Sequence, residues 1–361
     1  MQGAALPGFE DHLPHAHTFV LEQQLGGNIT EDPVTERTFL AHDVDGICWA
    51  PHERPRVRAQ GALTDCSKVA CMPEQLKFGL AFASSAGTDP QSALDICRAA
   101  EEAGFESVWG GEHVIFPSTI ESAYPYTPDG KVPATPETPI PDPLIWLAYV
   151  AAAAPTLRLG TCILILPQRN PLVLAKELAT LDHLSGGRVE LGIGVGWMKE
   201  EFDALGVPWE RRGARTDEYV AALRTIWSGS HVEFHGEFVD FEPLTCTPQP
   251  AQGPDVPILV GGDTPVAIRR AARLADGYFP GESDAARLVQ LIAAVRAECE
   301  AQDRDPDTLE INAMFSKLDD PAAGIDQMLE AGVGRAMLPA FFFAGPEGLD
   351  RLREFGDAHL G

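Results

Sequence analysis

The sequence predicts an α/β protein in which eight parallel strands alternate with helices and close into a (β/α)8 TIM barrel. Short runs rich in β-branched residues and leucine recur eight times, and helical patterns separate them. Where a single helix joins two such runs within few residues, the strands must be parallel with a right-handed crossover. The predicted strands are residues 77–83, 105–109, 158–166, 189–193, 257–260, 277–280, 309–315 and 334–339.

The first two strands are joined by a helix with clear start and stop signals. Asp89 can cap it, Pro90 suits its first turn, and its apolar face continues to Gly104. Residues 117–143, which follow the second strand, contain eight prolines and no helical period. A loop this long in a compact barrel is typical of a lid or binding loop, and the alternative is a surface insertion without ligand contacts. A helix over 143–154 then leads to the third strand.

The stretch 158–197 shows the strand–helix pattern most clearly. Asn170 caps a helix that begins at Pro171, and leucines at 174, 178, 181 and 184 form one apolar stripe. Gly186 and Gly187 end this helix, the fourth strand follows, and Glu200 and Glu201 begin the next helix.

The second half of the chain continues the alternation. Residues 216–227 predict a further helix, and residues 232–241 predict a small hairpin centred on His235 and Gly236. Thr264 and Pro265 begin the helix after the fifth strand. The helices predicted after the sixth and seventh strands are residues 285–301 and 321–331.

The composition excludes several classes of function. The formal net charge is −26, whereas nucleic acid binds basic surfaces, so we expect no nucleic-acid partner. The longest apolar stretch, residues 144–154, is too short to span a bilayer, so we expect no membrane partner. The first 30 residues have no lysine, arginine or sustained apolar run, and the seven cysteines include no CxxC pair. These features predict a cytoplasmic protein with reduced thiols.

Residues 1–71 differ from the rest of the chain. They contain five of the ten histidines, scattered prolines and few helical stripes. We interpret them as an irregular or disordered N-terminal extension, and residues 72–361 as one barrel domain that begins at Met72. Three histidines and two cysteines of the extension could in principle bind metal, but their spacing is loose and a polar tail is the simpler interpretation. They are His12, His15, His17, Cys66 and Cys71. We therefore predict no metal site.

Candidate site residues stand where strands end, because the carboxyl ends of barrel strands form the active face. Glu112 and His113 follow the second strand, and histidine can move a proton near neutral pH. Two pairs of glycines, Gly194 with Gly196 and Gly261 with Gly262, follow the fourth and fifth strands. Glycine lets a phosphate approach backbone N–H groups, although such glycines can also serve only tight turns.

Four phrases resemble the luciferase-like monooxygenase superfamily, in particular its coenzyme F420-dependent oxidoreductase branch. They are LGTCILILPQRNP, LAKELATLDHLSGGR, LGIGVGWMKEEFDALGVPWERRGARTDE, and PILVGG followed by ADGYFP, and they stand in order within residues 77–345. The resemblance implies a (β/α)8 barrel that moves a hydride or activates oxygen through a flavin-type ring. It also implies coenzyme F420 (deazaflavin) as cofactor, with FMN as the alternative, and a homodimer.

The resemblance gives the candidate residues roles. Deazaflavin members carry an acidic residue followed by histidine near the ring, which makes His113 the candidate acid/base, with Glu112 tuning it or touching the cofactor. The alternative for His113 is a packed histidine that a backbone carbonyl satisfies. Gly194 and Gly196 match glycines near the cofactor tail, and Gly261 with Gly262 match the phosphate-binding loop.

Two further positions follow from the resemblance. The family's third strand has a non-proline cis peptide that supports the cofactor ring, and it maps to Cys162 and Ile163. The thiol of Cys162 is expected to be structural. Sugar-phosphate dehydrogenases of the family place a glutamate where Trp197 stands here, so we do not expect that substrate, and Trp197 is expected to form a pocket wall.

The sequence therefore predicts an oxidoreductase that transfers a hydride between coenzyme F420 and a small organic substrate. The first alternative is an FMN-dependent monooxygenase on the same fold, since the fold cannot decide between them. The second is a barrel that binds a cofactor without turnover.

Overall fold

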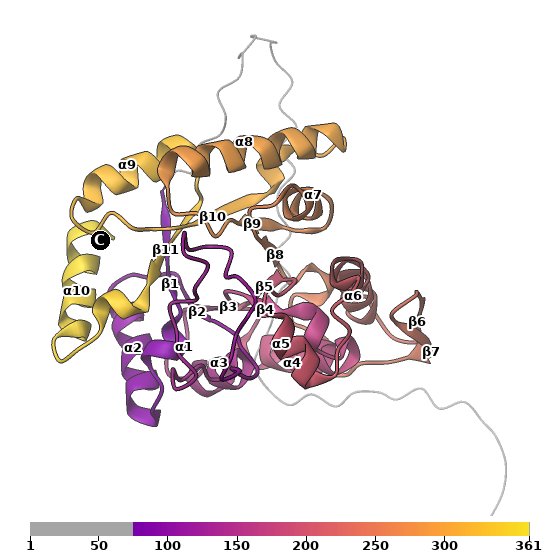
Figure 1. Ribbon diagram of the computed structural model, residues 1–361. Helices are drawn as coiled ribbons and strands as arrows, with labels where there is room; N and C mark the ends of the chain where they lie inside the picture. The colour runs from indigo at the N-terminus through magenta and orange to yellow at the C-terminus, as the bar shows by residue number, and fades with distance from the viewer. Residues whose placement is uncertain (1–74, 361) are drawn as a thin grey trace, which may run out of the picture. The chain divides into compact units, whose positions relative to one another are not determined.

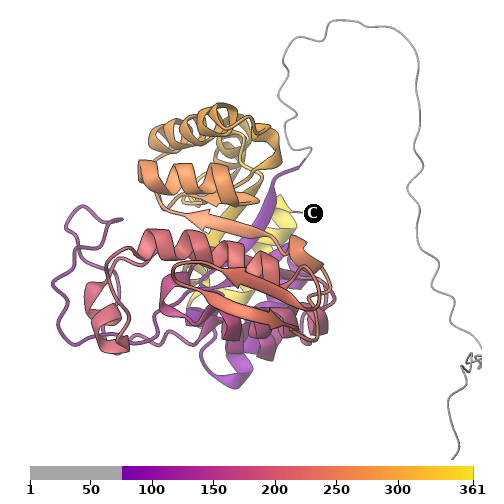
Figure 2. The same ribbon diagram turned by 90° about the vertical axis from the view of Figure 1, so that its right-hand side faces the viewer.

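The computed structural model describes residues 75–360, which form a closed barrel of parallel strands surrounded by helices (Figures 1 and 2). From β3, the order around the barrel is β2, β1, β11, β10, β9, β8 and β5, and pairing of β3 with β5 closes the ring. The bounds are β1 Lys77–Ala81, β2 Ser107–Gly110, β3 Arg158–Thr161, β4 Leu164–Ile165, β5 Val189–Gly194, β8 Ile258–Gly261, β9 Gly277–Phe279, β10 Glu310–Met314 and β11 Arg335–Pro339. Because β4 continues the course of β3 and pairs with β5, the barrel has eight strand positions, and the predicted fold class is confirmed.

Several helices begin with the same sequence pattern. Five of them have proline as the first residue, preceded by an aspartate, asparagine or threonine whose side chain accepts N–H bonds of the first turn. The helices are α1 Ala83–Ala86, α2 Pro90–Glu102, α3 Pro143–Val150, α4 Pro171–Ser185, α5 Lys199–Leu205, α6 Arg212–Ile226, α7 Pro265–Leu274, α8 Ala285–Ala301, α9 Pro321–Ala331 and α10 Gly348–His359. The hairpin is β6 Val232–His235 and β7 Asp240–Leu244, which pair with each other.

The interior of the barrel has two layers of different character. At the amino-terminal end of the strands, the buried guanidinium of Arg335 bonds to Glu106, Glu190 and Asn312. Towards the carboxyl ends the buried residues are apolar: Ala81, Trp109, Cys162, Leu259, Phe279 and Met337. We call this set the apolar floor, because it lies directly beneath the end of the barrel that carries the candidate site.

The structure corrects several element boundaries. The first strand ends at Ala81, because Phe82 adopts a left-handed conformation with φ of 57°. The predicted single strand over 158–166 is interrupted between β3 and β4, where the peptide bond from Cys162 to Ile163 is cis. The helix predicted from 216 begins four residues earlier, at Arg212, and the helix predicted over 143–154 ends at Val150. Two helices, α1 and α10, were not predicted from the sequence.

Residues 111–142, between β2 and α3, contain no helix or strand. In Figure 2 this segment is the long coil, drawn in purple, that lies beside the short helix α5. We call it the lid segment. Along residues 75–360, every helix is too short or too polar to cross a bilayer. The predicted extension 1–71, with its histidines and cysteines, lies outside the described residues.

Candidate active site

The residues that the sequence singles out all stand at the carboxyl ends of four strands. They are Glu112 and His113 after β2, Cys162 and Ile163 after β3, Gly194, Gly196 and Trp197 at the end of β5, and Gly261 and Gly262 at the end of β8. The contacts among these residues, described below, show which of them could form one site.

Ile163 connects three of these strand ends. A β-carbon on Gly194 would lie 2.6 Å from Ile163 Cδ1, and one on Gly261 would lie 3.1 Å from Ile163 Cγ2. Any larger residue at Gly194 would therefore collide with the isoleucine. The cis bond that precedes Ile163 is at the place where the family resemblance puts it. β3, β5 and β8 thus close tightly around one apolar side chain at the mouth of the barrel.

Cys162 belongs to the apolar floor. Its side chain is buried, and burial raises the pKa of its thiol to about 12. The thiol is therefore protonated at neutral pH and is a poor nucleophile, because the thiolate is the reactive form. This agrees with the structural role expected for this cysteine.

His113 has a carboxylate partner, but it is not its neighbour in the sequence. The Nδ1 atom of His113 lies 3.0 Å from Oε2 of Glu201, in the first turn of α5. The other oxygen of Glu201 accepts the backbone N–H of Val114 at 2.6 Å and that of Ile115 at 3.4 Å. Glu201 is fully buried, whereas 14% of the His113 side chain is exposed. The alternative of a histidine bonded to a backbone carbonyl is not what the structure contains.

Glu112 faces a different partner, so the prediction that it tunes His113 is not supported by the geometry. Its carboxylate accepts the N–H of Ile165 and forms a two-point ion pair with Arg169, with Nε at 2.8 Å. Arg169 also bonds to Asp142, the N-cap of α3. Burial raises the pKa of Glu112, and the charge of Arg169 opposes this shift. Glu112 therefore holds β4 and the residues after it in place beside the cis bond.

Sequence reasoning missed Glu201 and Arg169 as site residues. Glu201 was recognised only as part of the start of a helix, 88 residues after His113. No local pattern reveals a contact over that separation. The only available signal was that Glu201 falls within the third of the four matching phrases, GVGWMKEEF.

An aromatic chain crosses the mouth of the barrel. The ring of Trp197 meets His113 edge-on at 5.8 Å, and Tyr124 of the lid segment meets Trp197 at 5.1 Å. Tyr124 contacts Tyr126 at 5.4 Å, and the Tyr126 ring lies over Gly281, beyond β9. Trp197 therefore forms a wall between the histidine and the lid segment.

The lid segment is anchored to the start of α5. One carboxylate oxygen of Glu200 accepts the N–H groups of Glu121 at 2.7 Å and Ser122 at 2.9 Å. The hydroxyl of Ser122 accepts the N–H of Lys199 at 3.1 Å. Burial alone would raise the pKa of Glu200, but these donors prevail and lower it to about 2. Two consecutive glutamates therefore serve two loops, since Glu200 holds the lid segment and Glu201 holds the residues around His113.

The glycines at the rim have distinct reasons to be glycine. Gly196 has φ of 78°, and a β-carbon there would lie 2.6 Å from Phe202, so its size is fixed by packing. Gly262 has φ of 117°, a conformation that other residues rarely adopt. The N–H of Gly262 donates to the carbonyl of Phe279 at 3.3 Å. The next residue, Asp263, accepts the N–H of Gly281 at 2.8 Å, and burial raises its pKa.

These residues suit the ring of a flavin-type cofactor better than they suit the phosphate of that cofactor. The apolar floor and Ile163 form an apolar bed, and Gly194 and Gly261 carry no side chains that would cover it. For the phosphate, the turn at Gly262 offers space, but its N–H already has a partner, and the carboxylate of Asp263 is adjacent. The predicted phosphate role of Gly261 and Gly262 thus has less geometric support than the predicted ring support at Cys162 and Ile163.

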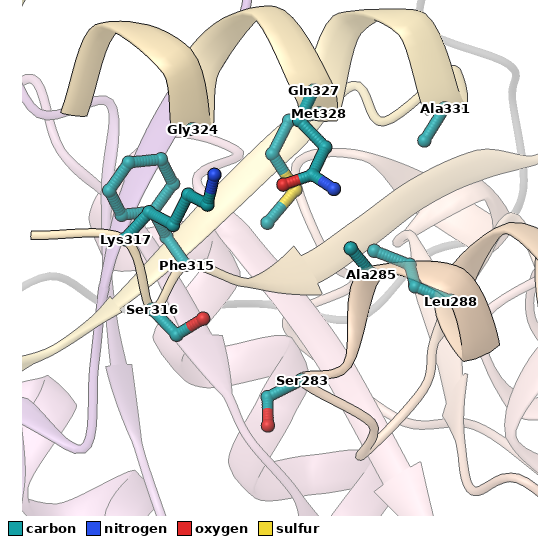
Figure 3. Close-up of a pocket in the computed structure, with 10 residues that line it drawn as sticks. All are labelled: Ser283, Ala285, Leu288, Phe315, Ser316, Lys317, Gly324, Gln327, Met328 and Ala331. Carbon is teal, nitrogen blue, oxygen red and sulfur yellow. The ribbon is translucent and has the colours of Figure 1, made fainter. Parts of the chain in front are cut away.

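A separate cavity, which His113 does not line, is at the ends of β9 and β10. Figure 3 shows it between the residues before α8, the end of β10 and α9, with Ser283, Phe315, Lys317 and Met328 around it. Its volume of about 30 Å³ suits one or two water molecules. It is too small for a cofactor ring or an organic substrate.

Comparison with known proteins agrees with this geometry. The chain is 38% identical over 213 residues to a protein of Mycobacterium tuberculosis described as uncharacterized, covering 59% of this chain and 73% of that protein. It is 34% identical over 245 residues to the F420-dependent glucose-6-phosphate dehydrogenase of Nakamurella multipartita, covering 66% of each chain. It is 36% identical over 155 residues to the FMNH(2)-dependent dimethylsulfone monooxygenase of Pseudomonas putida, covering 42% of this chain and 43% of that enzyme.

A solved structure has the same fold. The coenzyme F420 dependent tetrahydromethanopterin reductase of Methanopyrus kandleri superposes with a TM-score of 0.62 at 17% identity, covering 79% of this chain and 98% of that one. Residues 76–323 match the luciferase-like monooxygenase family, which accounts for more than half of the chain. The chain therefore belongs to the luciferase-like monooxygenase family.

Proposed function

We propose that this protein is an F420-dependent oxidoreductase that transfers a hydride between the deazaflavin and a small organic substrate. The observation that carries the proposal is a histidine held by a buried carboxylate at the mouth of the barrel, beside an apolar bed that suits a flat ring. Among the relatives described above, the F420-dependent enzyme matches this chain over 245 residues, whereas the FMNH(2)-dependent one matches over 155. This favours F420 over FMN.

Different residues of this chain would bind the cofactor, move the proton and exclude water. Coenzyme F420, when bound, supplies or accepts the hydride. Ile163 and the apolar floor support the ring from below, and Trp197 limits the space above His113. His113 gives or takes the proton that accompanies the hydride, so that the substrate gains or loses both. The lid segment, with Tyr124 and Tyr126, keeps water from the reacting atoms.

The substrate does not follow from the similarity to a glucose-6-phosphate dehydrogenase. The family's sugar-phosphate enzymes have a glutamate where this chain has Trp197, and the aromatic ring here contacts His113 instead. We therefore propose a substrate other than a sugar phosphate. We also propose that the protein acts as a homodimer in the cytoplasm, and light scattering after size-exclusion chromatography would test the dimer.

The second candidate is an FMN-dependent monooxygenase, which the 36% identity to the FMNH(2)-dependent enzyme favours. Purified protein should be heated to release any bound chromophore, and its absorption and mass spectra should be recorded. A deazaflavin mass supports the proposal, and an FMN mass overturns it in favour of the second candidate. Protein that is purified without a bound chromophore should be titrated with F420 and, separately, with FMN. A barrel that binds without turnover would bind F420 but show no redox reaction. Carbonyl and alkene compounds would not oxidise the reduced cofactor, and alcohols would not reduce the oxidised cofactor.

A further inference from the structure

We propose that Glu201 is a positioning residue that fixes His113 in the tautomer with the proton on Nδ1, so that Nε2 exchanges the catalytic proton. This inference deepens the proposed function and rests on it for the role of His113. It begins from the contact between Nδ1 of His113 and Oε2 of Glu201 at 3.0 Å.

The carboxylate of Glu201 cannot easily rotate or move. Its Oε1 atom accepts the N–H groups of Val114 at 2.6 Å and Ile115 at 3.4 Å, and both amides can only donate. These bonds favour the charged carboxylate, which has no hydrogen of its own to give. The backbone of α5 carries the side chain, and a carboxylate in the first turn of a helix is stabilised by the helix dipole.

The tautomer of His113 follows from this arrangement. Because a carboxylate only accepts, the proton in the bond between His113 and Glu201 belongs to Nδ1. In neutral His113, Nε2 is then the nitrogen with a free lone pair. When the imidazole is protonated, the Nε2–H bond breaks and the proton passes to one substrate atom while the hydride passes to another. The hydrogen bond between Nδ1 and Glu201 stays intact. The reverse reaction returns the proton to Nε2.

The remaining contacts of the ring fix its orientation without competing for Nδ1. Phe116 and Trp197 meet the imidazole edge-on, at 5.5 Å and 5.8 Å between ring centroids. The charged group in contact with the ring from α5 is Glu201. From its own loop, Glu112 is turned to Arg169, and from the lid segment Tyr124 lies on the far side of Trp197. Glu201 is thus the carboxylate that contacts this histidine and orients its ring.

The first test reads the unmodified protein and needs no cofactor. Protein labelled with 15N in histidine gives two-bond correlations that distinguish the two neutral tautomers, and His113→Gln identifies the signals of residue 113. We expect the Nδ1–H tautomer. Observation of the Nε2–H tautomer in the unmodified protein would overturn the inference, whatever the cofactor proves to be.

The second test removes the charge and keeps the shape. In Glu201→Gln the amide oxygen can accept the N–H groups of Val114 and Ile115, which leaves the amide NH2 facing Nδ1, so His113 should change to the Nε2–H tautomer. The matched control is Glu200→Gln, one residue away on the same helix, which should leave the His113 signals in place because Glu200 bonds to Glu121 and Ser122. An unchanged His113 tautomer in Glu201→Gln would overturn the inference.

The kinetic test separates this inference from the proposed function. With F420 as cofactor, Glu201→Gln should lower kcat about 10- to 100-fold, the range for residues that orient a functional histidine, and move the pH profile of kcat. The KM for cofactor should change little. If the NMR signals shift as expected but kcat and its pH profile do not, Glu201 still sets the tautomer, and the assignment of His113 as the acid/base fails.

Discussion

The ring of Tyr126 lies so close over Gly281 that a β-carbon on the glycine would come within 2.2 Å of Cε1 of the tyrosine. Tyr126 belongs to the lid segment, which leaves the barrel after β2, whereas Gly281 follows β9. The two strands are not neighbours in the barrel order, so this contact spans the mouth. The same tyrosine hydroxyl would lie 3.8 Å from a β-carbon on Gly262. The lid segment is therefore seated near its middle, at Tyr126, on two glycines of the opposite rim.

Gly281→Ala should displace the Tyr126 ring and loosen the lid segment. We expect faster limited proteolysis within residues 117–142 and weaker substrate binding, with global stability changed by no more than about 0.5 kcal/mol. In a Tyr126→Ala background, which removes the ring, the additional effect of Gly281→Ala should largely disappear. Equal effects of Gly281→Ala in both backgrounds would show that the contact does not hold the segment.

Glu200→Gln should loosen the same segment at Glu121 and Ser122. The amide that replaces the carboxylate loses the charge that accepts the N–H groups of Glu121 and Ser122, so cleavage after Phe116 should accelerate. The folded-state pKa of about 2 lies below the ordinary 4.5, so this anchor is complete above about pH 4.5 and is lost as the pH falls towards 2. Protection of the wild-type segment should therefore be constant between about pH 5 and pH 8, and a loss of protection in that interval would contradict the assignment.

Arg335→Met should destabilise the barrel without altering its site. The change leaves the half-buried Glu106 without its cation and the buried Glu190 with Arg158 alone, and a buried pair that loses one partner costs about 3–5 kcal/mol. Lys77→Met is the matched control, since Lys77 is half-exposed and pairs with Glu310 at the same end of the barrel. Its cost should stay within about 1 kcal/mol. Urea denaturation measures both, and similar losses for the two variants would refute the difference between the sites.

A chain that begins at Met72 should fold and bind cofactor like the full chain. The first strand begins at Lys77 and pairs with β2 and β11 within the described residues. The polar composition of residues 1–71 motivates the prediction. Circular dichroism and a cofactor titration of the shortened chain provide the check. Insoluble protein, or protein that no longer binds, would make residues 1–71 part of the barrel domain.

The sequence was a good guide where local chemistry decides the structure. Asp89, Asn170 and Thr264, each followed by proline, were predicted to begin helices and do so, because the cap and the fixed φ of proline act within one turn. The helices 285–301 and 321–331 have the predicted bounds. Helix α10 was missed although Leu352 and Phe355 have helical spacing and are buried, so in that case a signal was present.

The partner of His113 could not have been predicted by the same reasoning. Adjacent side chains of extended backbone point in opposite directions, so the acid next to the histidine in sequence was a poor choice of partner. Glu112 accordingly turns to Arg169, while His113 turns to Glu201 on a helix 88 residues away. Likewise, no residue pattern marks the interruption between β3 and β4. Its place came from the family resemblance alone.

The last prediction separates proton transfer from cofactor binding. If His113 is the acid/base, His113→Ala should lower turnover by about two to four powers of ten, the usual range for such a group. Cofactor affinity should change much less, because Ile163 and all of the apolar floor except Trp109 belong to other strands. Gly262→Val should have the opposite profile and weaken cofactor binding first, since a β-carbon there would lie 3.2 Å from Ala267 in a turn with φ of 117°.

A control variant must separate the backbone strain that valine causes at a positive φ from damage to the turn at Gly262, which is proposed to bind the cofactor. Gly186→Val is the control, because Gly186 also has positive φ, at 72°, but ends α4 with no atom within 4 Å of its β-carbon position. Both valine variants should lose stability, and only Gly262→Val should lose cofactor affinity beyond that loss. Near-normal turnover of His113→Ala at saturating substrate, with the hydride step rate-limiting in both proteins, would exclude the histidine as the acid/base. If the cofactor instead dissociates from His113→Ala, the histidine binds it, and the proton comes from another group or from water.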